Sequence, residues 1–339
     1  MFRVESYLSI NDFTTLNKSL QHRTLKDYTT LVGVNYPSLE LSYEVFGQPL
    51  HTAPIVLVNH ALTGNSDVAG EHTGWWKGIV SKGNLVDTDK YTIISINIPG
   101  NGYDNKPENL IEDYKSFTVR DVAQLFGLLL EDLGITKLHA IIAGSLGGGI
   151  AWEMSVLFPD LANYVIPIAS DWKATDWILA HNKVQEQILL NSKKPVHDAR
   201  MMAMLFYRTA ASFKEKFNRT QNEALGISNV ESWLLHHGYK LEQRFELKAY
   251  QMVNHLLSTL DITSERGTFE EVAKTIKATI IQIGIDSDFF FVPEENRETQ
   301  EVLARIGAKS VYKEITSIHG HDGFLVEDEQ LKELLKDVF

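Results

Sequence analysis

A short apolar segment that runs directly into a glycine-rich turn constrains this chain more than any other feature. Residues 138–144 read LHAIIAG and are followed by Ser145, Leu146 and three glycines, Gly147 to Gly149. The apolar, β-branched content predicts a buried strand, and the residues after the turn have the pattern of a helix. Small residues let a strand and a helix approach closely. The turn is therefore expected to lift the serine hydroxyl out at the carboxyl end of a sheet.

The turn has the form of a nucleophile elbow, G-x-S-x-G, in which a strained strand-to-helix junction presents a serine. Here the pattern reads Ala143-Gly144-Ser145-Leu146-Gly147, so alanine fills the small space of the first glycine. The alternative is a glycine-rich turn that binds phosphate, as in nucleotide-binding folds. The segment has no GxGxxG pattern and no Walker lysine, which favours the elbow.

Apolar segments and helical segments alternate along the rest of the chain. Buried strands are predicted at residues 55–60, 91–98, 138–144, 164–170, 278–285 and 310–316, after a half-buried strand at 39–46. Helices are predicted at residues 120–133, 146–158 and 328–339, the last with Asp328 as its N-cap. With the elbow, this alternation predicts an α/β-hydrolase fold, a mostly parallel sheet with helices on both faces.

The alternation breaks over residues 174–274, which look helical and are rich in methionine, histidine and aromatic residues. Because this stretch lies between two core strands, it is interpreted as a helical lid inserted into one domain, with an independent helical domain as the alternative. The core then comprises residues 31–173 and 275–339. Residues 1–30 are polar and poorly periodic and are interpreted as an N-terminal extension.

Composition excludes several classes of function. A formal net charge of -12 argues against nucleic-acid binding, which requires clustered lysine and arginine. The chain has no cysteine, which excludes thiolate catalysis and cysteine-ligated zinc. Neither a signal peptide nor an apolar run of about 18 residues is present, so a cytoplasmic protein with no membrane span is expected.

A serine hydroxyl becomes a nucleophile when a histidine, itself held by a carboxylate, takes its proton. In this fold the three residues follow in the order Ser, Asp, His. Asp286 and Asp288 follow one late predicted strand, and His319 and His321 follow the last one. Asp288 lies deeper in its loop and His321 directly follows a glycine. We therefore favour Asp288 and His321, with the other two residues as alternatives.

Two further features of this site can be assigned. Acyl transfer places negative charge on a carbonyl oxygen, which backbone N–H groups must stabilise. The candidates are the N–H of Leu146, after the nucleophile, and that of Leu62, in the loop at 60–64. The alternative for that loop is an ordinary turn.

The neighbouring histidines His319 and His321 also suggest a metal site. No second cluster of ligands has suitable spacing, so no metal is expected.

Several segments together resemble the homoserine O-acetyltransferase family. They are LSYEVFG (41–47), NHALTG (59–64), GWWKGIV (74–80) with DTDKY (87–91), TVRDVAQ (118–124), GSLGG (144–148), SDFFFVP (287–293) and GHDGFL (320–325). They occur in the order of the family over roughly residues 35–335, so the resemblance covers nearly the whole chain.

The resemblance implies a homodimeric enzyme of methionine biosynthesis that acts on small molecules. An acetyl group from acetyl-CoA, or another acyl group from its acyl-CoA, would pass to Ser145 and then to the hydroxyl of homoserine or a related small alcohol. Acyl-CoA is a co-substrate, and no bound cofactor is implied. A serine esterase or hydrolase of the same fold is the alternative, and a non-catalytic partner subunit is a third possibility.

The resemblance also assigns individual residues. Its S-D pattern places the acid at Asp288, and its G-H-D pattern places the base at His321. The following residue, Asp322, matches a position that helps bind the amine of the amino-acid substrate. Tyr207 and Arg208 match a Tyr-Arg pair on the lid.

Three segments around the substrate depart from the family pattern. The family usually has a Gln-Arg pair on the first lid helix, and its arginine helps hold the carboxylate of the acceptor. In NKVQEQILL, Glu186 takes that position, where it is expected to contact substrate and repel a carboxylate. IPGNGYDNKPEN (98–109) replaces a loop expected to resemble LGGCxGSTGP, and RFELKAY (244–250) replaces RFDxNSY.

Overall fold

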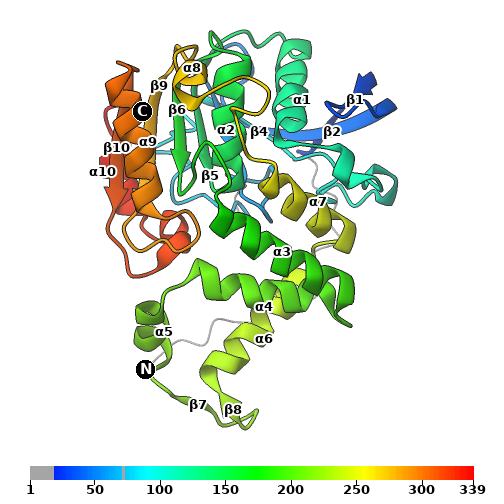
Figure 1. Ribbon diagram of the computed structural model, residues 1–339, viewed down its shortest axis with the longest axis vertical. Helices are drawn as coiled ribbons and strands as arrows, with labels where there is room; N and C mark the ends of the chain where they lie inside the picture. Colours follow the sequence, from blue (N-terminus) through cyan, green and yellow to red (C-terminus); the bar gives the residue numbers. More distant parts are fainter. Residues whose placement is uncertain (1–18, 71–72) are drawn as a thin grey trace.

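Eight strands form one sheet in the computed structural model, which describes residues 19–70 and 73–339 (Figure 1). The strand order is β1-β2-β4-β3-β5-β6-β9-β10, and neighbours from β4 to β10 are parallel. The strands are β1 (Gln21–Thr29), β2 (Asn35–Gly47), β3 (Ile55–Asn59), β4 (Thr92–Ile96), β5 (Leu138–Gly144), β6 (Ala162–Ile168), β9 (Thr279–Ile285) and β10 (Ser310–Ile315). The mostly parallel sheet predicted from the sequence is confirmed.

Each central strand buries both of its faces. In β3, Ile55 and Leu57 pack into one core cluster and Val56 and Val58 into another, because successive side chains of a strand point to opposite sides. The first cluster contains the apolar residues of α1 (Val119–Asp132) and α2 (Leu146–Leu157). The second contains residues of the 68–86 segment and of α10 (Asp328–Leu335). Continuous apolar runs such as IVLV follow from this double burial.

The predicted N-terminal extension is wrong for residues 21–29, which form β1 and pair antiparallel with β2. Tyr28 donates a hydrogen bond to Asp121 Oδ1 over 2.9 Å, and the N–H of Leu31 donates to the same oxygen over 2.8 Å. The carboxylate of Asp121 also completes a capping box with Thr118 at the start of α1. The N-terminal strand is thereby fastened to the first core helix.

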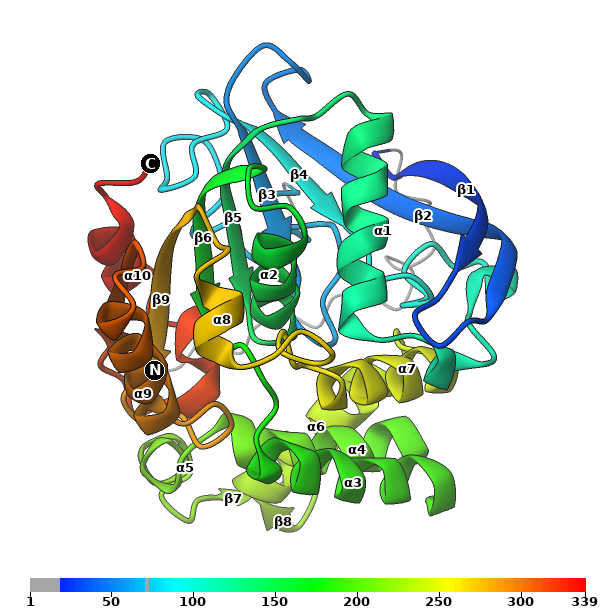
Figure 2. The same cartoon turned by 45° about the horizontal axis from the view of Figure 1, so that its top comes forward.

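The other core helices also lie around the sheet (Figure 2). They are α8 (Phe269–Ala273), α9 (Pro293–Arg305) and α10, with 3-10 turns η2 (Pro107–Asn109), η3 (Tyr114–Ser116) and η4 (Gly320–Leu325). Asp328 is the first residue of α10 and Glu327 is its N-cap, so the predicted cap was wrong by one residue. Within the described ranges, no helix combines the length and apolar character needed to cross a membrane.

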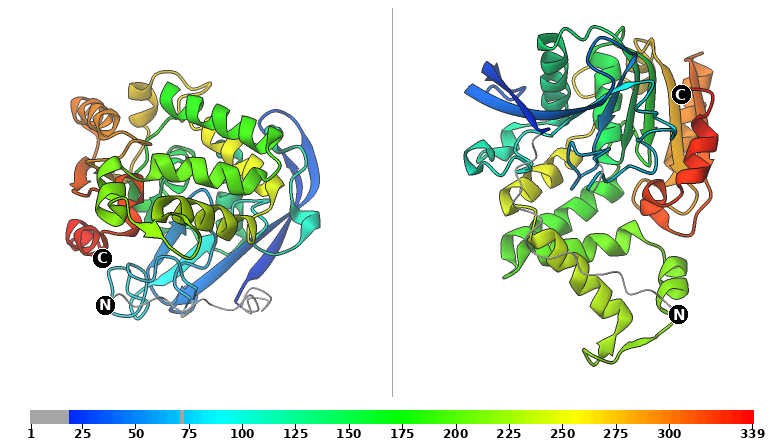
Figure 3. Two further views of the ribbon diagram at one scale, coloured as in Figure 1. Left: turned by 90° about the horizontal axis from the view of Figure 1, so that it is seen from below. Right: turned by 180° about the vertical axis from the view of Figure 1, so that it is seen from behind.

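A helical insertion projects beyond one end of the sheet (Figures 1 and 3). It comprises α3 (Asp176–Asn191), α4 (Pro195–Tyr207), α5 (Ala210–Phe217), α6 (Asn229–Glu242) and α7 (Leu247–Ser258), with a two-stranded hairpin of β7 (Gln221–Asn222) and β8 (Ile227–Ser228). The predicted lid boundary at residue 274 is too late. Helix α8 packs on the core, where the ring of Phe269 contacts Trp152 of α2 at 6.3 Å and stacks on Trp172, after β6, at 4.4 Å.

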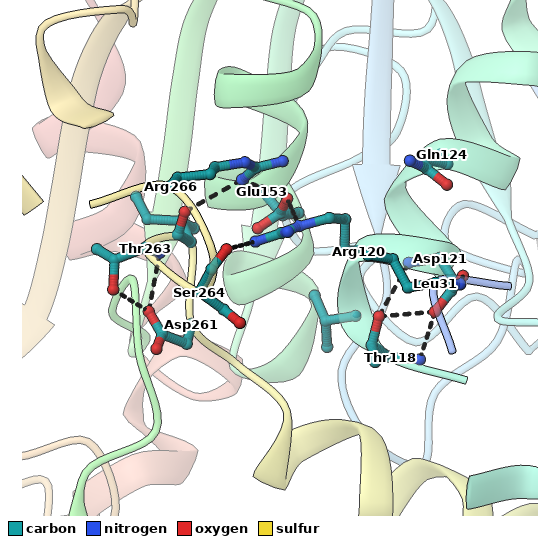
Figure 4. Close-up of polar contacts among 12 residues, drawn as sticks. Leu31, Thr118, Arg120, Asp121, Gln124, Glu153, Asp261, Thr263, Ser264 and Arg266 are labelled. Atoms are coloured by element: carbon teal, nitrogen blue, oxygen red, sulfur yellow. Dashed lines mark hydrogen bonds and ion pairs between the residues drawn. The ribbon is translucent and has the colours of Figure 1, made fainter. Parts of the chain in front are cut away.

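A buried ion cluster fastens the end of the insertion to the core (Figure 4). The carboxylate of Glu153, on α2, lies 2.8 Å from Arg120 Nε on α1 and 2.7 Å from Arg266 in the loop before α8. Arg120 also donates to the carbonyl of Ser264 over 2.8 Å. The Glu153 side chain is only 3% exposed; burial raises its pKa, and the two arginines offset part of that rise.

Candidate active site

Ser145 occupies a strained turn between β5 and α2. Its backbone has φ +53° and ψ −125°, a region that costs free energy for a residue with a side chain. The turn also requires glycines. A Cβ on Gly147 would lie 2.5 Å from the carbonyl oxygen of Asn59, and one on Gly144 would lie 2.5 Å from the ring of Phe324. The sequence therefore allows β3, β5 and α2 to meet closely around one serine.

The turn brings Ser145 to a histidine and a carboxylate. The hydroxyl of Ser145 lies 2.9 Å from His321 Nε2, and the other ring nitrogen, Nδ1, lies 2.7 Å from Asp288 Oδ2. All three residues are buried, with exposures of 5%, 3% and 2%. The second carboxylate oxygen of Asp288 accepts from the N–H of Phe290 over 2.7 Å. The acid is thus held at both oxygens.

The two alternative residues have other partners. Asp286 accepts a hydrogen bond from the N–H of Ser317 over 2.9 Å, which joins the loops after β9 and β10. His319 Nδ1 lies 2.9 Å from the hydroxyl of Ser212, on the helical insertion. Neither residue is hydrogen-bonded to Ser145 or to His321 in the described part of the chain. The structure brings together the residues favoured from the sequence, Asp288 and His321.

The predicted oxyanion-hole residues are both buried. Leu62 is 7% exposed and Leu146 is completely buried. Within residues 19–70 and 73–339, the backbone N–H groups of Leu62 and Leu146 donate no hydrogen bond. Leu146 is also the first residue of α2, so its N–H lies at the positive end of that helix. Both N–H groups are free to donate a hydrogen bond to a developing oxyanion.

His60 fixes the loop that carries Leu62. Its Nδ1 donates to the carbonyl of Ala61 over 2.8 Å, and its Nε2 accepts from the N–H of Ile98 over 3.1 Å. Complete burial lowers the pKa of His60 to about 4, so the ring is neutral and can play both roles. The sequence placed His60 in this loop, but a local pattern cannot identify Ile98 as its partner.

The Tyr-Arg pair of the lid reaches the catalytic residues. The ring of Tyr207 lies 5.4 Å from that of His321, centroid to centroid, and burial raises the pKa of Tyr207 to about 12. Arg208 Nε lies 2.8 Å from the carboxylate of Asp322. Of the four predicted substrate-binding residues, Tyr207 thus lies beside His321, and Arg208 pairs with Asp322.

Glu186, the fourth predicted substrate-binding residue, forms two ion pairs. Its carboxylate lies 3.1 Å from Lys115 Nζ and 2.7 Å from Lys183 Nζ, and these lysine side chains are 61% and 67% exposed. The two lysines lower the pKa of Glu186. The negative charge is thus compensated at the solvent-exposed edge of α3. The contact of Glu186 with a substrate carboxylate stays a prediction.

Aromatic residues that the sequence did not single out enclose the histidine. The rings of Phe290 and Phe291 lie 5.1 and 5.9 Å from that of His321. On its other side, Phe290 contacts the ring of His181 at 4.8 Å. His181 is buried, and its Nε2 has no hydrogen-bond partner among the described residues. The SDFFFVP segment was the available signal for the phenylalanines.

A serine at a strand-to-helix turn, hydrogen-bonded to a carboxylate-held histidine above a mostly parallel sheet, defines an α/β-hydrolase-fold protein. The alpha/beta hydrolase fold family matches residues 54–264 of this chain. A homoserine O-acetyltransferase of Cyclobacterium marinum is 31% identical over 91% of each chain, and that of Symbiobacterium thermophilum is 33% identical over 90% of this chain and 89% of its own. The chain belongs to the homoserine O-acetyltransferase family.

The fold itself is shared more widely. The crystal structure of esterase E22 has a TM-score of 0.83 with this chain, at 17% identity, and covers 94% of this chain and 99% of its own. At that level of identity the likeness concerns the fold alone. The choice between acyl transfer and hydrolysis therefore rests on the family relatives and on the residues around Ser145.

Proposed function

We propose that this protein is an acyltransferase that moves an acetyl or related acyl group from acyl-CoA, through an ester on Ser145, to the hydroxyl of homoserine or a similar small alcohol. The observation that carries the proposal is the 2.9 Å contact between His321 Nε2 and the Ser145 hydroxyl, with Asp288 on the opposite ring nitrogen. Membership of the homoserine O-acetyltransferase family supports the choice of donor and acceptor.

The first half-reaction acylates the serine. His321 takes the proton of the Ser145 hydroxyl as the oxygen attacks the thioester carbonyl, and Asp288 stabilises the imidazolium. The N–H groups of Leu62 and Leu146 hydrogen-bond the oxyanion. When the carbon–sulfur bond breaks, His321 returns the proton to the leaving sulfur, and CoA departs as a thiol.

The second half-reaction transfers the acyl group. His321 takes the proton of the acceptor hydroxyl as that oxygen attacks the ester on Ser145. The ester bond to Ser145 then breaks and the serine oxygen recovers a proton from His321. Water in place of the alcohol would give hydrolysis by the same steps. The helical insertion and the phenylalanines around His321 support transfer, because they reduce the access of water to the acyl-enzyme.

Asp322, Arg208 and Tyr207 form the proposed acceptor side of the site. The Asp322 carboxylate would bind the ammonium group of an amino-acid acceptor, while its ion pair with Arg208, 2.8 Å long, holds it in place. Tyr207 would pack against the acceptor carbon chain beside His321. In this arrangement the lid supplies specificity and the core supplies the reacting groups.

We also propose that the protein acts in the cytoplasm as a homodimer. The helices α4 and α6 expose Leu205, Leu235 and Tyr239, with exposures of 55%, 45% and 50%. Apolar surface of this kind, gathered on projecting helices, is suited to a second copy of the lid. Light scattering on the purified protein measures the oligomeric state directly.

The test of the function is a transient-kinetic experiment. Purified protein mixed with acetyl-CoA should release CoA in a burst that matches the amount of enzyme, and further turnover should require homoserine. Mass spectrometry should locate the acetyl group on Ser145. Steady CoA release without an alcohol would instead indicate a hydrolase, and the absence of any acyl-enzyme would indicate a non-catalytic protein.

A further inference from the structure

His181 is a buried histidine of the lid that the mechanism above does not use. It lies on α3, whose buried face also contains Ile178 and Leu189. It is 5% exposed, as little as Ser145, so it belongs to the enclosed interior of the molecule and not to the surface of the lid. A polar ring in such a place normally has hydrogen-bond partners for its nitrogens.

Aromatic rings connect His181 to the catalytic histidine. Its ring lies 4.5 Å from that of Phe206 and 4.8 Å from that of Phe290, centroid to centroid. The ring of Phe290 in turn lies 5.1 Å from that of His321. One phenylalanine ring therefore contacts both imidazoles, and His181 lies within one aromatic ring of the catalytic base.

The hydrogen bonds of a neighbouring amide decide which nitrogen of His181 carries the proton. Asn182 donates from Nδ2 to the hydroxyl of Ser258 over 3.0 Å, and that hydroxyl donates to the carbonyl of Asn254 over 3.3 Å. The amide oxygen of Asn182 is therefore the atom that lies 3.3 Å from His181 Nδ1, and this oxygen can only accept. Nδ1 accordingly carries the proton, and Nε2 presents a lone pair.

The Nε2 atom of His181 is thus a buried acceptor without a donor. It has no hydrogen-bond partner among residues 19–70 and 73–339. Burial lowers the pKa of His181 to about 4, so the ring is neutral near pH 7 and Nε2 keeps its lone pair. The neighbouring phenylalanine rings have no polar hydrogen to donate. Because an unpaired buried acceptor is unfavourable, a ligand that supplies an N–H or O–H group would be bound selectively here.

Both substrates of the proposed reaction carry donors of this kind, but at different positions. In an amino-acid acceptor, the hydroxyl has to lie at His321 Nε2, and the proposed ammonium site is Asp322, so both donors are already assigned to other residues. In acyl-CoA, the pantetheine arm has an amide N–H that only two methylene groups separate from the thioester sulfur. With the thioester carbonyl at Ser145, this N–H is within reach of a residue one aromatic ring away from His321.

We propose that His181 Nε2 accepts a hydrogen bond from the pantetheine amide of the acyl donor, so that His181 is a specificity residue for acyl-CoA. The proposal rests on the acyltransferase function proposed above. It assigns the two substrates to different parts of the lid. The end of α4 contributes Tyr207 and Arg208 to the acceptor side, and α3 contributes His181 to the donor side.

The test compares two thioesters that differ in this one group. The first is N,S-diacetylcysteamine, which carries the pantetheine amide beside an acetyl thioester. The second is S-(4-oxopentyl) thioacetate, a ketone in which a methylene group replaces the N–H. The second-order rate constant for acylation of Ser145 is measured with each by mass spectrometry of the acyl-enzyme.

The variant is H181F, which keeps an aromatic ring and removes the acceptor. The control is H139F, because His139 also lies among aromatic rings, those of Tyr91, Tyr164 and Phe339. It is located at the opposite end of β5 from Ser145, and its Nε2 already has a partner, the carbonyl oxygen of Val338 at 2.8 Å.

The wild-type protein should react about ten-fold faster with the amide than with the ketone, since one buried hydrogen bond accounts for about that factor. H181F should lose this preference and H139F should keep it. With acetyl-CoA as donor, kcat/KM for acetyl-CoA should fall by a similar factor in H181F, while kcat/KM for homoserine stays the same. Equal rates with the two thioesters in the wild-type protein, or a loss confined to kcat/KM for homoserine, would overturn the proposal.

The readout separates this proposal from the function on which it rests. Both small thioesters acylate Ser145 whether water or an alcohol then removes the acyl group, so the preference is measurable even in a hydrolase. A missing CoA burst together with a clear preference for the amide would refute the acyltransferase function and still support amide binding by His181. If H181F does not fold, the wild-type preference decides, and H181Q, whose amide oxygen is another acceptor, should retain part of it.

Discussion

The imidazole of His321 lies between Ser145, 2.9 Å from Nε2, and a carboxylate, 2.7 Å from Nδ1, although 176 residues separate it from the serine. Aromatic rings from η4, the loop after β9 and the lid surround it, among them Phe324 at 5.9 Å. A ring packed on several sides cannot turn away from the serine. The positions of the reacting groups are thus set before any substrate binds.

Removing the nucleophile should abolish the chemistry while leaving the fold intact. We expect Ser145→Ala to lower the rate of acyl-enzyme formation by about 10⁴-fold or more, because residues of such a triad act as a unit. Alanine also removes little packing at a turn held by glycines. Stopped-flow release of CoA measures the rate, and an unchanged melting temperature is the control. Retained acylation of the variant would place the nucleophile elsewhere.

The two aspartates after β9 form a matched pair for testing the acid. Asp288→Asn keeps the shape of the side chain but favours the wrong tautomer of His321, and should lower kcat by about 10³- to 10⁴-fold. Asp286→Asn alters only the contact with the Ser317 N–H and should change kcat by less than about ten-fold. Steady-state assays of both variants make the comparison. A larger loss in Asp286→Asn would reverse the assignment.

The sequence predicted the core well because the relevant signals are local. Parallel strands buried on both faces leave continuous β-branched runs, as in β3 and β9, and the elbow demands small residues within five positions. β1 escaped prediction because QHRTLKDYT is an edge strand with mostly exposed side chains, so it carries no apolar run. Local patterns detect burial, and an edge strand has little.

Contacts between the lid and the core could not be predicted in the same way. The hydrogen bond from Arg244 to the Thr63 carbonyl joins residues 181 positions apart, and no local pattern encodes it. A helix pattern gives the buried face of α3, where Gln185 is buried, but does not identify the lysines that Glu186 meets. The ion pairs of Glu186 therefore had to come from the structure.

Stability should fall in mild acid because His60 is buried in its neutral form. Its pKa is lowered from 6.5 to about 4, so the unfolded chain binds more protons over this range. The contribution is fully present above pH 6.5 and is lost as the pH falls toward 4. Between pH 7.5 and pH 5 the loss is about 2 kcal/mol.

Urea unfolding at these two pH values measures the effect. His60→Gln should be less stable at pH 7.5, because the bonds to Ala61 and Ile98 are weakened. It should also show a smaller difference between the two pH values, since the titrating group is gone. An equal pH difference in the variant and the wild-type protein would show that other groups cause the acid loss.

The carboxylate of Glu153 should contribute far more to stability than an exposed one. Glu153→Gln leaves Arg120 and Arg266 without their partner in a buried place, and should lower the free energy of unfolding by about 2–4 kcal/mol. Glu329→Gln is the control, because the Glu329 side chain is 88% exposed in its pair with Lys332. It should change stability by less than about 0.5 kcal/mol. Similar values for both variants would contradict the role of the buried cluster.

Charge reversal at Glu186 distinguishes a surface role from a substrate role. In Glu186→Arg a third positive charge would lie beside Lys115 and Lys183, so the free energy of unfolding should fall by about 1 kcal/mol. Glu186→Gln removes only the attraction and should cost about half as much. Neither variant should change the KM for homoserine, because the carboxylate already lies among solvent-exposed lysines. Urea unfolding and acetyl transfer from acetyl-CoA are the two measurements. A gain of homoserine activity in Glu186→Arg would mean that this position faces the acceptor.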